Sequence, residues 1–414
     1  MVFQDTKIFY VIIAKFFHAF LGFLIFFLIS NKLSIESFGV YQSFFTIMNW
    51  GTLLLSFGLN SKIFETFSRN NKDSLEGYKL AAHSGIFSFI ACFFIFIFLM
   101  CFFNFNDLDL IGLFICTFLN IMTINMNSID RGNLNFSRQL FFSGIFLNIL
   151  LIGFVLLSES LTHNKLILYL ELSLFLNIII LFVIHKDIIK PLKNGFITTV
   201  FKFKKMNYSK IFNQGNVFYF NDLLSSFVIL IPIFLLTYLG MFKDLALLSF
   251  SLKVLFVFNL IYQSLCLYQI PIFIRNYKKK QIAAWRNLFF NSFCVFILLI
   301  AFALAFFSYI EEVIVFINAD YLSSSLIIKI MIFSCLINAL TGPSESLLIY
   351  TRYAKKLNLY RLFLIPFYCL AFYYSYKIYG IVSIAIVILF ITIFMNIVYL
   401  SLMLKLYESG YVFD

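Results

Sequence analysis

Ionisable side chains stand inside apolar segments of this chain, and they are the residues best suited to do chemistry. The stretch "IIAKFFHAFLGFLIFF" (12–27) carries Lys15 and His18, and two further apolar runs carry Lys253 and Lys329. A charged side chain at the centre of a membrane-spanning helix costs about 2.5–3.5 kcal/mol, so we expect these cations to face a polar interior and to bind an anion there. In the alternative, each lysine extends along its own helix to the nearer membrane surface.

Carboxylates are the second group of buried candidates. Asp222 lies deepest, in "GNVFYFNDLLSSF" (215–227), and Glu171 lies closer to the end of its apolar run. Such a carboxylate can bind a coupling ion, H+ or Na+, or open and close a gate. Alternatively, Asp222 can pair with Lys253 and serve only to stabilise the fold.

Glu345 stands beside a predicted interruption of a helix. It follows Gly342 and Pro343 in "TGPSESLL" (341–348). Proline removes a backbone donor and clashes with the preceding turn, so the helix is expected to break there. We predict a hinge at Gly342 and Pro343 and a coupling or gating role for Glu345.

Composition places these residues in a membrane protein. Of the 414 residues 62% are hydrophobic and only 12% are charged, whereas a soluble protein has about a quarter charged. Apolar runs long enough to cross a bilayer recur along the chain, which predicts an all-α fold. The twelve predicted spans are 8–29, 39–61, 80–103, 110–128, 141–157, 165–185, 211–236, 245–270, 288–308, 326–350, 361–376 and 381–404.

The cationic residues predict the orientation of these spans. With the N-terminus in the cytoplasm, 24 of the 31 Lys and Arg residues, Arg361 among them, fall in inner segments, 4 fall in outer loops and 3 fall within spans. Inner loops of membrane proteins carry an excess of Lys and Arg, so both termini are predicted to be cytoplasmic. The net charge of +12 is then explained by topology and by contacts with anionic membrane lipids, and no nucleic acid is expected as a partner.

The longest inner loop divides the chain into two sets of six spans. We predict an N-terminal half at 1–185, a basic cytoplasmic linker at 186–210 and a C-terminal half at 211–414. An even number of spans in each half makes the halves parallel repeats, which typically enclose a central cavity.

Several kinds of chemistry have no signature in the sequence. The glycines do not cluster into a phosphate-binding loop, and the four histidines have no metal-ligand spacing, so no cofactor or metal is expected. A membrane polysaccharide polymerase or glycosyltransferase is the alternative from another class. It would be expected to carry a large outer loop, and the predicted outer loops are short. We therefore predict a transporter and not an enzyme.

Several segments resemble the bacterial polysaccharide flippases of the Wzx type, which are relatives of the multidrug and toxin extrusion transporters. The segments that carry the resemblance are "NKLSIESFGVYQSF" (31–44) followed by "GLNSKIF" (58–64), "NDLLSSFVILIPIFLLTYLGMFKDLALLSFSLKV" (221–254), "QIPIFIRNYKKK" (269–280) and "TGPSESLLIYTRYAKKLNLYR" (341–361). Length and number of spans match over the entire chain. The chain departs from the family in having Leu247 and Leu248 where a Gly-x-Tyr turn is common. Lys15 also stands where cation-coupled drug exporters often carry a carboxylate.

The resemblance implies an inner-membrane flippase of O-antigen and lipopolysaccharide biosynthesis. It would move undecaprenyl-pyrophosphate-linked oligosaccharide units from the inner to the outer leaflet by alternating access. Lys15, His18, Lys253 and Lys329 would bind the anionic head group, with a polysaccharide polymerase and a chain-length regulator as partners. Within the same superfamily, a cation-coupled multidrug exporter and a peptidoglycan-precursor flippase remain alternatives.

Overall fold

The structure, a computed structural model, is helical throughout the residues that it describes. These are residues 2–60, 63–64, 67, 75–102, 110–133, 135, 138–139, 141–185, 208–277, 281–349 and 351–409. They form two compact units, Met1–Tyr219 and Phe220–Asp414, each of which is described by itself. The boundary between the units falls inside a helix. The predicted linker lies outside the described residues, apart from 208–210, which open that helix.

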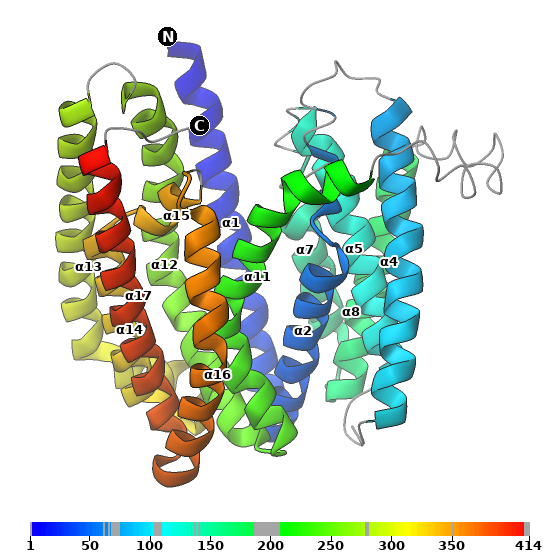
Figure 1. The fold of residues 1–414 in the computed structure, drawn as a ribbon. Helices are drawn as coiled ribbons and strands as arrows, with labels where there is room; N and C mark the ends of the chain where they lie inside the picture. Colours follow the sequence, from blue (N-terminus) through cyan, green and yellow to red (C-terminus); the bar gives the residue numbers. More distant parts are fainter. Residues whose placement is uncertain are drawn as a thin grey trace. The chain divides into compact units, whose positions relative to one another are not determined.

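The N-terminal unit is a helical bundle (Figure 1). Its helices are α1 (Val2–Lys32), α2 (Ile35–Leu55), α4 (Leu75–Phe102), α5 (Leu110–Gly132), the π-helix η1 (Phe141–Ile145), α7 (Phe146–Leu157) and α8 (His163–Ile184). Helix α5 packs against α2, α4 and α8, and α7 packs against α1 and α8. Buried side chains that include Ile63, Met126 and Leu181 form an apolar core in this bundle.

The C-terminal unit begins within α11 and is built around α14 (Figure 1). Its helices are α11 (Tyr208–Tyr238), α12 (Phe242–Tyr277), α13 (Gln281–Asn318), the 3-10 helix η4 (Ala319–Ser324), α14 (Ser325–Thr341), α15 (Ser344–Leu348), α16 (Ala354–Tyr379) and α17 (Ile381–Ser409). Helix α14 packs against α12, α13 and α17, so neighbouring helices cover it on several sides. Ile328, Met331 and Ile332 of α14 are accordingly fully buried.

The predicted spans correspond to the long helices. The described residues contain twelve helices of twelve residues or more, one for each predicted span. The ninth span was predicted at 288–308, but α13 is 38 residues long. Charged residues such as Arg286 and Glu311 end the apolar run on either side, and they are compatible with a helix that continues beyond it.

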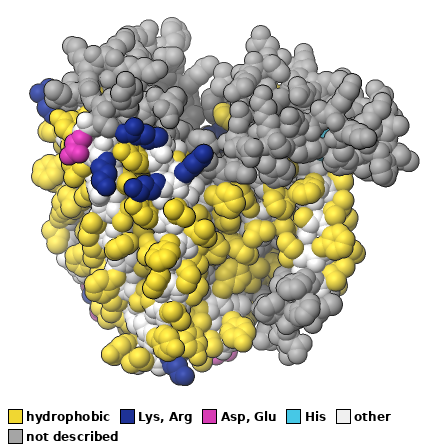
Figure 2. All heavy atoms as spheres, in the orientation of Figure 1, with side chains coloured by type: hydrophobic (Ala, Val, Ile, Leu, Met, Phe, Trp, Pro, Cys, Tyr) yellow, Lys and Arg dark blue, Asp and Glu magenta, His cyan; other side chains and the backbone are white. Residues whose placement is uncertain are grey.

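The helices have the apolar surfaces of membrane spans. Six stretches of the described residues are long and apolar enough to cross a membrane, and one of them, Ala284–Thr341, covers both α13 and α14. Only 17% of its most apolar window is buried, although the mean hydropathy there is 2.7. Figure 2 shows hydrophobic side chains covering the described helices on one face, with Lys and Arg gathered near one end. Side chains this apolar and this exposed require lipid around them, which agrees with the predicted membrane fold.

The predicted break at Gly342 and Pro343 is present. Helix α14 ends at Thr341, Gly342 has a φ of 66°, and the short helix α15 follows Pro343. A positive φ is strained for residues other than glycine, so this position favours glycine as well as a break in the helix. Whether the break acts as a hinge remains a prediction.

Candidate functional site

A small polar cavity lies within the C-terminal unit. Its volume is about 130 Å³, and side chains of α11, α14, α15, α16 and α17 line it. The polar residues at its wall are Ser225, Asn338, Glu345, Arg361, Tyr368, Thr392, Asn396 and Tyr399. The cavity has room for water molecules or a small ion.

Arg361 is the central cation of this cavity. The residue is 4% exposed, although it belongs to a helix whose neighbouring positions reach the surface. Its guanidinium donates to the carboxylate of Glu345, to the hydroxyl of Tyr399 at 2.7 Å and to Asn221 Oδ1 at 2.5 Å. The guanidinium also stands 5.7 Å from the centre of the Tyr399 ring. A buried charge needs such partners, because its desolvation is otherwise very costly.

Neutral side chains form a second network at the same cavity. Asn396 donates to Asn338 Oδ1 at 2.7 Å and to the carbonyl oxygen of Thr392 at 2.8 Å. The hydroxyl of Thr341 donates to Asn396 Oδ1. Thr341 is the last residue of α14, so this network joins α17 to the position at which α14 breaks.

The charges of the site do not cancel. Asp222 is exposed, its side chain is hydrogen-bonded by that of Asn221, and it lies within electrostatic range of Glu345 and Arg361. With both carboxylates ionised and Arg361 charged, the three residues carry a formal charge of −1. Such a site attracts a cation, either a proton on a carboxylate or a metal cation beside them. Among the described residues, no group of three or more His, Cys, Asp and Glu side chains forms a metal cluster, so any metal cation would also depend on neutral oxygens.

Two of the predicted site residues are associated with Arg361, while a third has a different neighbour. Glu345 is hydrogen-bonded to Arg361, and Asp222 lies within electrostatic range of both residues. Lys329 of α14 instead lies 3.8 Å from a carboxylate oxygen of Glu311 in α13, and that glutamate side chain is 66% exposed. This position resembles the surface placement that the sequence offered as the alternative for Lys329.

The other predicted residues are distributed over both units. His18 lies on α1 of the N-terminal unit, where its Nδ1 is 3.4 Å from Asn148 Nδ2 and its ring covers Gly144 of η1. Glu171 on α8 and Lys253 on α12 are both partly buried. Lys15 belongs to α1, but its side chain lies outside the part of the chain that the structure describes.

Arg361 is the residue of this site that the sequence did not predict. The sequence assigns Arg361 to the inner cations that set topology, whereas the structure buries it within the protein. A signal was present in the spacing. The buried residues of α16 are Ala354, Leu357, Arg361, Tyr368 and Phe372, which follow one another at helical intervals. Arg361 therefore lies on the same face as the buried apolar residues.

Comparison with solved structures identifies the fold. An outward-facing multidrug resistance MATE family transporter of the MOP superfamily matches with a TM-score of 0.57 and 15% identity, over 97% of this chain and 96% of that one. The lipid II flippase MurJ in an inward closed conformation matches with a TM-score of 0.68 and 15% identity, over 96% of this chain and 87% of that one. A Vibrio cholerae MATE transporter matches with a TM-score of 0.55 and 14% identity, over 98% and 97% of the two chains. No protein-family model and no curated protein sequence matches the chain.

The chain thus has the membrane-transporter fold shared by MATE proteins and MurJ. The expected all-helical membrane fold is confirmed over nearly the whole chain. At these identities the likeness concerns the fold alone, and the transported molecule is a matter of proposal.

Proposed function

We propose that this protein is a flippase for undecaprenyl-pyrophosphate-linked oligosaccharide units and works by alternating access in the bacterial inner membrane. The observation that carries the proposal is the likeness to a lipid II flippase, with a TM-score of 0.68 against 0.57 for the outward-facing MATE transporter. A lipid-linked substrate also agrees with the segments that resemble Wzx flippases. O-antigen or lipopolysaccharide biosynthesis would supply the substrate, and a polymerase and a chain-length regulator would act after it.

Cations and carboxylates are given different roles in this proposal. Lys15 and Lys253, with His18, neutralise the pyrophosphate as the head group crosses the membrane, because a charge in apolar surroundings needs a counter-charge. Lys329 would contribute only at the membrane surface. The 130 Å³ cavity is assigned to coupling and not to substrate binding, because its cation, Arg361, already has partners within the protein.

Coupling is proposed for the cluster of Asp222, Glu345 and Arg361. Uptake of one cation, H+ or Na+, compensates the formal charge of −1. It also weakens the electrostatic attraction between the carboxylates and the Arg361 guanidinium. Because Glu345 follows the break at Gly342 and Pro343, a change in this ion pair would act directly on the broken helix. Glu171 remains a further candidate for the same role.

The test is translocation of a fluorescent undecaprenyl-pyrophosphate-linked oligosaccharide in vesicles that contain the purified protein. We expect protein-dependent movement between leaflets that responds to a pH or sodium gradient. Lys253→Met should reduce the rate, while Lys165→Met, at the exposed start of α8, should not. Absence of translocation for this lipid would contradict the proposal, and translocation of lipid II alone would instead assign the protein to the peptidoglycan-precursor flippases.

The likeness to MATE transporters supports multidrug export as the second candidate. The same vesicles distinguish the two functions when they are loaded with organic cations. Gradient-driven efflux of these cations without lipid translocation would assign the protein to drug export. A new glycosidic bond in either assay would instead indicate a polymerase or glycosyltransferase.

A further inference from the structure

Two asparagines of the N-terminal unit meet between α2 and α5. Asn120 Nδ2 of α5 donates to Asn49 Oδ1 at 3.4 Å and to Thr52 Oγ1 at 3.2 Å, both on α2. Asn49 itself donates to the carbonyl oxygen of Phe45 in its own helix at 2.9 Å. Asn120 lies near the middle of α5, a helix long and apolar enough to cross a membrane, so we expect the amide pair at the depth of the hydrocarbon core.

The Asn49 side chain is not covered by the N-terminal unit. From Phe38 to Asn60, every residue is buried or half-buried except Asn49, which is exposed. A polar amide is costly to expose to lipid, because hydrocarbon offers it no hydrogen-bond partner. The face of α2 that carries Asn49 therefore borders water and not lipid.

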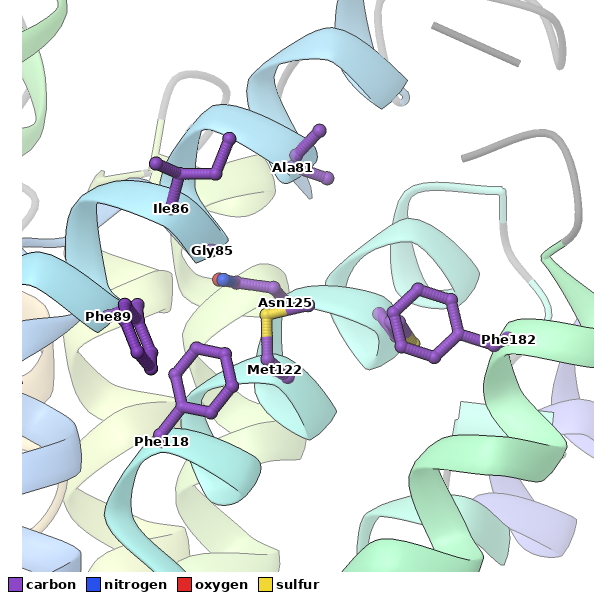
Figure 3. A pocket seen from close by; sticks show the side chains of 10 residues that line it. Ala81, Gly85, Ile86, Phe89, Phe118, Met122, Asn125 and Phe182 are labelled. Atoms are coloured by element: carbon purple, nitrogen blue, oxygen red, sulfur yellow. The ribbon is translucent and has the colours of Figure 1, made fainter. Parts of the chain in front are cut away.

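Asn120 lies on the side of α5 that is turned away from α4. Phe118 and Met122, two positions before and after it, line an apolar crevice together with residues of α4 (Figure 3). An α-helix has 3.6 residues per turn, so a residue two positions from both of them projects to nearly the opposite side. Asn120 is only half-buried there, which places its amide at the same water-accessible face as Asn49.

The amide pair keeps one donor and one acceptor for a ligand. A primary amide has two N–H donors and an acceptor oxygen. Among the described residues, one Nδ2 hydrogen of Asn49 is used on Phe45 and the other has no acceptor, while Asn120 Oδ1 has no donor. A hydroxyl group both donates and accepts, so it can accept from Asn49 and donate to Asn120.

We propose that Asn49 and Asn120 bind hydroxyl groups of the sugars in the transported head group. This inference rests on the proposed function and names the residues that recognise the neutral part of the substrate. Hydrogen bonds from the two amides replace water that the sugar loses on its way across the membrane. Two uncharged amides suit a polyhydroxylated, neutral group better than an organic cation.

The experiment measures equilibrium binding of two lipids to the purified full-length protein in detergent. One lipid is undecaprenyl pyrophosphate, and the other is the same lipid carrying N-acetylglucosamine. We expect the unaltered protein to bind the glycosylated lipid more tightly. Asn49→Leu and Asn120→Leu should each weaken that binding about fivefold, which corresponds to one hydrogen bond, and should leave binding of undecaprenyl pyrophosphate unchanged.

Asn31→Leu is the matched control. Asn31 is exposed and donates to the carbonyl oxygen of Phe27 at 3.1 Å, as Asn49 does to that of Phe45, but it lies at the end of α1. This variant should bind both lipids as the unaltered protein does. Retained binding of undecaprenyl pyrophosphate reports that a variant is folded, and Asn49→Ala removes the same amide if the leucine variant fails to fold.

Two outcomes would overturn the inference. One is equal affinity of the unaltered protein for the two lipids. The other is a pair of asparagine variants that lose affinity for both lipids alike or for neither, which would leave the amides only a role in the contact between α2 and α5. The proposed transport function survives either outcome if the vesicle assay shows translocation, whereas absence of binding of both lipids would contradict that function and this inference together.

Discussion

The Arg361 guanidinium donates to the carboxylate of Glu345 across the segment that separates α15 from α16. Arg361 also donates to Asn221 of α11 and Tyr399 of α17, so one side chain connects four helices of the C-terminal unit. The pair lies at a cavity wall and directly after the break of α14, which makes it the strongest candidate for a charge-dependent change in this unit.

Arg361→Gln should destabilise the protein by leaving Glu345 without its counter-charge. Breaking a buried ion pair typically costs about 3–5 kcal/mol, and the lower end applies because the Glu345 side chain is 37% exposed. Thermal unfolding in detergent provides the measurement. In the double variant Arg361→Gln/Glu345→Gln the loss should be smaller than the sum of the two single losses. Strict additivity would show that the two side chains do not interact.

Gly144→Ala should disturb the contact between η1 and α1. The added Cβ would occupy the position of the His18 ring, so the ring or the helix must move. Overpacking of this kind costs about 1–3 kcal/mol, and we expect a matching loss of thermal stability. Gly153 of α7 supplies the control, because a Cβ there meets nothing within 4 Å. Gly153→Ala should be neutral or slightly stabilising, and equal losses in both variants would contradict the prediction.

Lys32→Met should destabilise the end of α7. The Lys32 ammonium donates to the carbonyl oxygens of Val155 at 2.7 Å and Ser158 at 2.9 Å, where the last carbonyls of α7 lack partners within the helix. Hydrogen bonds from a charged donor contribute roughly 1.5–3 kcal/mol. Protease susceptibility of the loop after α7 should increase together with the loss of stability. Lys165→Met removes a lysine whose hydrogen bonds to Ser160 are exposed, whereas those of Lys32 are partly buried, and its effect should be clearly smaller.

Asp130→Asn should destabilise the N-terminal unit. Asp130 is fully buried, accepts from Arg138 Nε at 2.6 Å and lies 3.1 Å from His185 Nε2. Loss of the negative charge weakens both contacts, and a loss of about 1.5–3 kcal/mol is expected. Arg138→Lys keeps the positive charge and should cost less in the same unfolding experiment. An unchanged melting temperature for Asp130→Asn would show that this cluster contributes nothing to stability.

Reporter fusions test the predicted orientation in the membrane. A green fluorescent protein fused after the C-terminus should fluoresce, because that end is predicted to be cytoplasmic. Alkaline phosphatase inserted at the turn of Gly240 and Met241 should be active, because this turn is predicted to lie outside. The reverse pattern would overturn the assignment of both termini to the cytoplasm.

The helices and their approximate boundaries could be predicted from the sequence for a physical reason. Each span must satisfy its backbone internally and present apolar side chains to lipid, so length and hydropathy identify it without knowledge of its neighbours. The break at Gly342 and Pro343 was predictable in the same way, since proline and glycine act on the backbone at their own positions. The predicted boundaries were wrong where polar residues continue a helix beyond its apolar run, as in α13.

The side-chain partners were decided only by the tertiary structure. The sequence left pairing with Lys253 as one of two interpretations of Asp222, whereas only the packing of α11, α15 and α16 shows that Asp222 lies in electrostatic range of Glu345 and Arg361. In the same way, packing places His18 on Gly144 and buries Asn125 Oδ1 without a hydrogen-bond partner among the described residues. Hydropathy determines that a segment lies in the membrane, whereas its rotation about its own axis depends on the shapes of the neighbouring helices. That rotation decides whether an arginine such as Arg361 sets topology at the surface or holds a charge cluster together inside the protein.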